Sequence, residues 1–179
     1  MKRLLLIGLA VTLLAGGVAL SVTSTGQEEM CRVLAPDEGK RFLPDKVPME
    51  TELVPIDTRD YSAIQFPNKT RFAVALLASQ GLVADMQKKY QMVLVSEAKV
   101  RLGRWVIPAG IAGAAFEPQA DANAPTRGLV TRDFNGSEIE GIIMTLDPAG
   151  KENGIKLVPK GATQFELRIG KYVIEGVLR

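Results

Sequence analysis

The chain has 179 residues, 46% of them hydrophobic and 23% charged, and this length predicts one domain. Its net charge of +2 comes from Lys2 and Arg3, so the chain after the N-terminal segment is neutral and lacks the basic surface of a nucleic-acid binder. Histidine is absent and Cys31 is the only cysteine, which disfavours hydrolases, metal sites and cofactor attachment and rules out an intramolecular disulfide. The composition predicts a protein that is not an enzyme and holds no metal or cofactor.

Residues 1–23 form an apolar segment with a positively charged start. Lys2 and Arg3 precede an uncharged run over 4–22, which is typical of a signal peptide or a membrane anchor. Small residues at Ala19 and Ser21 favour cleavage before residue 22, whereas the length of the run is close to the roughly 20 residues that span a bilayer. Both alternatives stay open, and both place the rest of the chain outside the cytoplasm, since the basic N-terminus stays inside.

Small residues recur at four-residue spacing within this segment, at Gly8, Thr12 and Gly16. On a helix this spacing forms a groove in which a second transmembrane helix can pack closely. If the segment is retained, the sequence predicts a single-pass inner-membrane protein whose helix contacts another membrane protein. If it is cleaved, the sequence predicts a periplasmic or secreted protein.

Residues 24–68 are predicted to form an extended tether. The segment is polar up to Pro48 and is interrupted repeatedly by proline, which leaves room for short edge strands only. Within it, Glu28, Glu29 and Met30 precede Cys31 where a lipidated cysteine would need small residues, so lipidation is not expected.

The β-rich domain is predicted over 69–179, beginning with a buried strand after Arg71. One helix follows in residues 80–90, with Leu82, Val83, Met86 and Tyr90 on its apolar side; Ser79 is its candidate cap. After Tyr90, short apolar runs alternate with turn residues and predict strands near 91–96, 99–102, 104–107, 111–116, 128–133, 139–146, 155–158, 165–169 and 171–178. Many short strands at this spacing indicate a small β-sandwich or barrel with one short helix.

A near-repeat relates VRLGRWVI, residues 100–107, to LRIGKYVI, residues 167–174. Each copy predicts a strand, a glycine turn and a second strand, so two similar hairpins of one sheet explain the repeat. The alternative is a binding surface, for a protein partner or a glycan, made of the paired basic and aromatic side chains. Its candidate residues are Arg101, Arg104, Trp105, Arg168, Lys171 and Tyr172.

Two longer stretches, YQMVLVSEAKVRLGRWVIPAGIAGAAFEP and the closing FELRIGKYVIEGVL, resemble parts of small secreted or periplasmic bacterial β-sandwich proteins of uncharacterised activity. The resemblance covers residues 71–179. It implies a periplasmic β-sandwich and names no activity, cofactor or site residue.

The sequence therefore predicts a non-enzymatic envelope protein whose β-domain faces the outer side of the inner membrane and binds another protein, as an accessory subunit of a membrane complex. The alternative hypothesis is a secreted module that binds a small molecule or a glycan, with Trp105 or Tyr172 as the platform. Neither hypothesis includes a nucleic acid.

Overall fold

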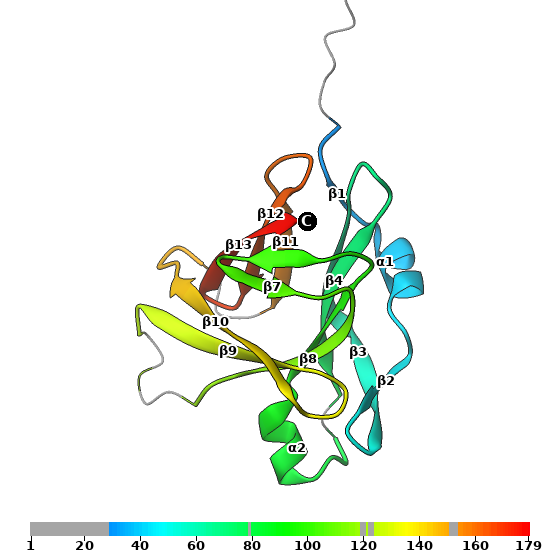
Figure 1. Ribbon diagram of the computed structural model, residues 1–179, viewed down its shortest axis with the longest axis vertical. Coiled ribbons are helices and arrows are strands. Elements are labelled where there is room, and N and C mark those ends of the chain that lie inside the picture. The colour runs from blue at the N-terminus through cyan, green and yellow to red at the C-terminus, as the bar shows by residue number, and fades with distance from the viewer. Residues whose placement is uncertain (1–28, 79, 119–120, 122–123, 151–153) are drawn as a thin grey trace, which may run out of the picture.

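The structure is a computed structural model that describes residues 29–78, 80–118, 121, 124–150 and 154–179. These residues are mainly β, as predicted, and one antiparallel sheet curls into a nearly closed barrel (Figure 1). Around the barrel the hydrogen-bonded order is β3-β4-β5-β8-β9-β10-β13-β12-β11, with β1 and β2 beside β3 and the β6–β7 hairpin beside β13. The elements in chain order are β1 (Arg32–Val33), α1 (Pro36–Phe42), β2 (Lys46–Met49), β3 (Glu52–Gln65), β4 (Arg71–Leu77), α2 (Ala84–Lys89), β5 (Met92–Ser96), β6 (Val100–Leu102), β7 (Trp105–Ile107), β8 (Gly110–Phe116), β9 (Thr126–Arg132), β10 (Glu138–Leu146), β11 (Ile155–Pro159), β12 (Gln164–Ile169) and β13 (Tyr172–Leu178).

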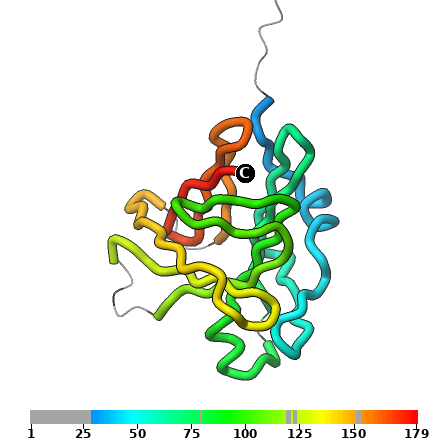
Figure 2. Tube along the Cα trace, viewed as in Figure 1, coloured from blue at the N-terminus to red at the C-terminus, as the bar shows by residue number. Residues whose placement is uncertain are grey.

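Two hydrophobic cores lie on opposite faces of β3, β4 and β5, because successive side chains of a strand point to opposite faces. On β4, for example, Phe72 and Val74 face the barrel interior, and Ala73 and Ala75 face outward. The inner core fills the barrel with side chains from its strands and from the β6–β7 hairpin, which crosses the barrel in Figures 1 and 2. The outer core lies beneath α1, β2 and α2; its members include Leu43, Val47, Met49, Val54, Ile56, Met86 and Tyr90.

The predicted tether over 24–68 is wrong for its described part, residues 29–68, which form β1, α1, β2 and the 14-residue strand β3. Two of the prolines, Pro36 and Pro48, fit these elements because they stand where no interior ladder hydrogen bond is lost. Pro36 occupies the first turn of α1, and Pro48 lies in β2, which pairs with β3 alone. Cys31, in the same segment, is buried in the inner core, and its thiol donates a hydrogen bond to the carbonyl of Gln164.

The described residues contain two short helices, whereas the sequence predicted one. α2 confirms the helix expected within 80–90 and buries Met86 and Tyr90 as predicted, but Val83 caps the helix and is exposed. Ser79, the predicted cap, lies outside the described residues. α1 was missed: its second and third residues, Asp37 and Glu38, suit a helix start, and the Glu38 carboxylate accepts a hydrogen bond from the Ala35 N–H at 3.1 Å.

The barrel closes between β3 and β11 through side chains. β11 ends the hydrogen-bonded order, yet it lies beside β3. The N–H of Ile155 donates to Asp60 Oδ1 at 3.1 Å, and the N–H of Leu157 donates to Ser62 Oγ at 2.9 Å. Two side chains spaced two residues apart on β3 thus satisfy two backbone donors with the same spacing on β11.

Candidate functional site

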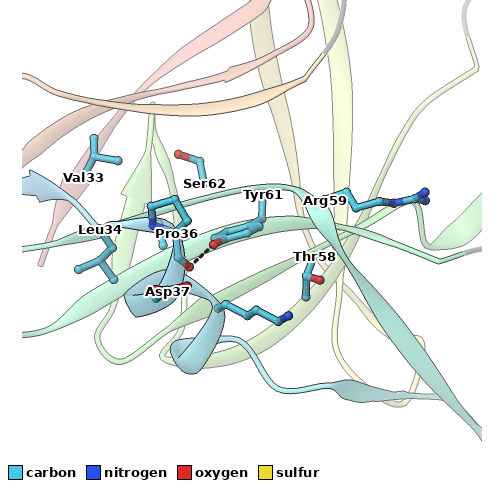
Figure 3. A pocket seen from close by; sticks show the side chains of 10 residues that line it. Val33, Leu34, Pro36, Asp37, Thr58, Arg59, Tyr61 and Ser62 are labelled. Carbon is cyan, nitrogen blue, oxygen red and sulfur yellow. Dashed lines mark hydrogen bonds between the residues drawn. The ribbon is translucent and has the colours of Figure 1, made fainter.

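Two cavities lined by described residues are candidate binding sites. The first is a groove of about 390 Å³ between α1 and β3, shown in Figure 3. Three of its polar side chains already have partners: the Tyr61 hydroxyl donates to the Pro36 carbonyl, Arg59 pairs with Asp57, and Ser62 Oγ accepts from the Leu157 N–H. The Arg59 guanidinium holds the pKa of Asp57 down at about 2. Because these three side chains already have partners, they offer a ligand little to bind.

The second cavity has a volume of about 610 Å³ and lies at one end of the barrel. It is called the barrel mouth here. Antiparallel neighbours bring the last residues of some strands beside the first residues of others. The lining side chains accordingly come from the ends of β4, β8 and β12, the starts of β9, β11 and β13, and the middle of β3. They are Asp60, Leu76, Phe116, Arg127, Ile155, Ile169, Lys171 and Tyr172, with Gly154 and Gly170 completing the wall.

Arg127 lies between two aromatic rings in the barrel mouth. Its guanidinium carbon is 4.2 Å from the centre of the Phe116 ring and 5.8 Å from that of Tyr172. The two rings are 6.0 Å apart and tilted by 53°, and the Tyr172 hydroxyl donates to the Ala124 carbonyl at 3.2 Å. Such ring contacts attract a cation by about 0.5–2 kcal/mol, depending on its exposure to water.

The register of β9 places Arg127 inside the barrel. Alternate residues of a strand share one face, so Arg127 is on the face of Leu129 and Thr131, both fully buried. Gly128, in between, faces outward and is covered by the Glu117 side chain. The arginine is therefore the charged end of an otherwise inward-facing row.

The Nε atom of Arg127 is buried and has no hydrogen-bond partner among the described residues. Two other charged residues line the mouth. Asp60 accepts a hydrogen bond from the Ile155 N–H, and Lys171 follows the turn glycine Gly170. The arrangement combines apolar walls, two aromatic rings and one guanidinium with spare donors. It can hold an apolar group and orient a polar one, which is the usual composition of a small-molecule site.

A polar cluster on the outer side of the sheet, around the buried Tyr90, also has its groups paired. The Tyr90 hydroxyl donates to Glu50 Oε1 at 3.2 Å, and Lys89 Nζ is 3.4 Å from the same oxygen. Burial, with the Glu50 charge adding to it, raises the pKa of Tyr90 to about 12. Because the Tyr90 ring covers Gly113 and fills the outer core, we read this cluster as structural.

The six residues predicted as a binding surface divide between the two hairpins. Tyr172 and Lys171 line the barrel mouth, and Arg168 lies in an adjoining hollow of about 510 Å³ that shares Gly154 and Gly170 with it. In the other hairpin, Arg104 lies on the Trp105 ring at 4.7 Å, and Arg101 donates to the Gly103 carbonyl at 2.6 Å.

The residues most relevant to the barrel mouth, Arg127 and Phe116, were not among those predicted. One feature of the sequence could have indicated Arg127: it is a charged residue that shares the alternation of Leu129 and Thr131, which are buried positions of the same strand. Only the fold brings Phe116 and Tyr172 to that side chain, because 11 residues of sequence separate Phe116 from Arg127 and 45 separate Arg127 from Tyr172.

Gly8, Thr12 and Gly16, predicted to pack against a membrane partner, lie outside the described residues. In the described part of the chain, no helix has the length and apolar character needed to cross a membrane. Nor do the described residues gather three or more potential metal-binding side chains in one place. Comparison with family models, with curated proteins and with solved structures found no match.

Proposed function

We propose that the chain is an exported binding protein whose β-barrel takes a small molecule at the barrel mouth. The observation that carries the proposal is the Phe116–Arg127–Tyr172 group in a cavity of about 610 Å³. This volume falls in the range of roughly 300–1,000 Å³ typical of small-molecule sites. The apolar walls would supply contact area, and the polar side chains would fix the orientation.

Export of this binding protein rests on the N-terminal segment. Lys2 and Arg3 before a long apolar run favour passage to the outer side of the inner membrane, with or without cleavage. In a periplasmic or secreted setting the protein would capture its ligand outside the cytoplasm. The proposed role includes no reaction, so bound ligand should be recovered unchanged.

A blocked cavity tests the proposal. Leu76 lines the barrel mouth from β4, and Leu76→Trp would place an indole in the cavity. Val106→Trp is the matched control, because Val106 is an exposed residue of β7 and does not line the cavity. Compounds from a mixed small-molecule library that raise the melting temperature of the wild type should fail to stabilise Leu76→Trp and should still stabilise Val106→Trp. Equal stabilisation of both variants, or of none of the three proteins, would refute the proposed site.

The sequence also favours a second candidate, a protein partner in the membrane. It depends on retention of the N-terminal segment and on the small residues Gly8, Thr12 and Gly16. Intact-mass measurement on protein from native membranes would show whether the segment is retained. If it is, Gly8→Leu and Gly16→Leu should weaken co-purification with the partner in mild detergent, whereas a mature N-terminus near residue 22 would remove the premise.

A further inference from the structure

We propose that the ligand of the barrel mouth is an organic anion with an aromatic or apolar body, and that Arg127 binds its anionic group. The inference rests on the proposed function and adds the chemical class of the ligand. The arginine side chains of the described residues differ in what they contact.

Most of the other arginines that contact a protein group have an oxygen partner. Four pair with carboxylates: Arg32 with Glu38, Arg59 with Asp57, Arg71 with Glu97, and Arg168 with Glu166 and Asp147. Arg101 and Arg132 donate to backbone carbonyls. Arg127 makes no hydrogen bond or ion pair to a described residue, and its contacts are the rings of Phe116 and Tyr172.

An unpaired guanidinium at a partly buried position costs free energy, because it has lost water without gaining an acceptor. The rings attract its charge, but they do not take up its N–H donors as a carboxylate does. Two other arginines lie on rings: Arg71, on Phe42, is paired with Glu97, and Arg104, on Trp105, is exposed, so water can satisfy its donors. A bound carboxylate or sulfonate would supply two acceptor oxygens to Arg127, in the geometry that a guanidinium fits best.

The rest of the cavity selects the body of the ligand. Leu76, Ile155 and Ile169 offer apolar surface, and the two rings offer faces for stacking. An inorganic anion would leave these walls uncovered, and a neutral sugar would leave Arg127 without a charged partner. Asp60 lines the same cavity and would repel an anion, so the anionic group should point toward Arg127 and Lys171.

A pair of isosteric probes tests the inference. Titration calorimetry at pH 7 would compare 2-naphthoate with 2-naphthamide, which has the same ring system and no charge, on the full-length chain. We expect 2-naphthoate to bind about 10- to 100-fold more tightly, the factor that charge-assisted hydrogen bonds typically contribute. Arg127→Met, which keeps an unbranched side chain and removes the guanidinium, should remove this preference. Arg104→Met, the control on a ring contact outside the cavity, should retain it.

Equal affinity of the wild type for the two probes would overturn the anion inference and leave the barrel mouth as a small-molecule site. Absence of binding by both probes, together with a blank library screen, would overturn the proposed function as well. A second measurement follows the arginine side chain in the wild type and needs a variant only to assign its signal. The ¹⁵Nε signal of Arg127, assigned by its loss in Arg127→Lys, should shift with 2-naphthoate and stay in place with 2-naphthamide; the same small shift with both would count against Arg127 as the anion partner.

Discussion

The two hairpins of the near-repeat have almost the same local structure and quite different surroundings. In β6–β7, Leu102 pairs with Trp105, and in β12–β13, Ile169 pairs with Tyr172, so a two-residue turn joins the strands in each. The glycine at the first turn position has φ of 58° for Gly103 and 59° for Gly170. This confirms the sequence-based explanation that the repeat marks two similar hairpins.

Beyond the turn the hairpins diverge. β12 and β13 are barrel strands, and Tyr172 is 4% exposed at the barrel mouth. The β6–β7 hairpin is attached to β13 by one side only, and Trp105 is half-buried. Local sequence thus determines the turn, whereas the position of the hairpin in the sheet determines whether its aromatic residue lines a cavity or lies near the surface.

The largest expected difference between the hairpins is in the aromatic residues. Tyr172→Ala should lower the free energy of unfolding by about 3–5 kcal/mol, since it leaves a cavity in the inner core. Trp105→Ala should cost less than half as much, because part of the indole is already in water. Urea unfolding followed by circular dichroism would measure both. Tyr172→Phe is the control and should cost about 1 kcal/mol for the lost hydrogen bond to Ala124; similar losses for the two alanine variants would break the comparison.

The turn glycines should show a smaller and more similar effect. Gly103→Ala and Gly170→Ala would each force a side chain into a positive-φ conformation, at a cost of about 1–2 kcal/mol. At Gly103 the Cβ would in addition lie 3.1 Å from Ile174 Cδ1, which adds to the cost there. Gly161→Ala serves as control, since it has space and an ordinary φ, and should change stability little. Thermal unfolding would contradict the shared turn if one hairpin tolerated alanine freely.

The paired arginines of the repeat should show the smallest difference. Arg168→Met removes ion pairs to Glu166 and Asp147, and should cost about 0.5–1.5 kcal/mol at low salt and less at high salt. Arg101→Met removes a hydrogen bond to the Gly103 carbonyl and should change stability by about 0.5 kcal/mol with little dependence on salt. Urea unfolding at two salt concentrations would separate the two, and a salt-dependent loss in Arg101→Met would place that side chain in an ion pair after all.

The strands after residue 90 were predictable because turn residues mark their ends. The turn Asn135–Gly136, for instance, separates β9 from β10, and Gly136 has φ of 88°. The segment before residue 69 was not, because Pro36 and Pro48 look like interruptions until the edge position of β2 and the start of α1 are known. Prediction of the candidate site required the sheet order as well. Phe116 and Arg127 meet only because the end of β8 lies beside the start of β9 in the sheet.

Closure of the barrel by Asp60 and Ser62 has a consequence for how copies of the chain behave toward one another. An edge strand with free N–H groups can pair with a strand of a second molecule, which is a common start of aggregation. At β11 the donors of Ile155 and Leu157 are already held by the two side chains of β3. Exchange of these two small polar residues for apolar ones would leave those donors without acceptors. We therefore expect the two side chains to disfavour strand pairing between molecules as well as to close the barrel.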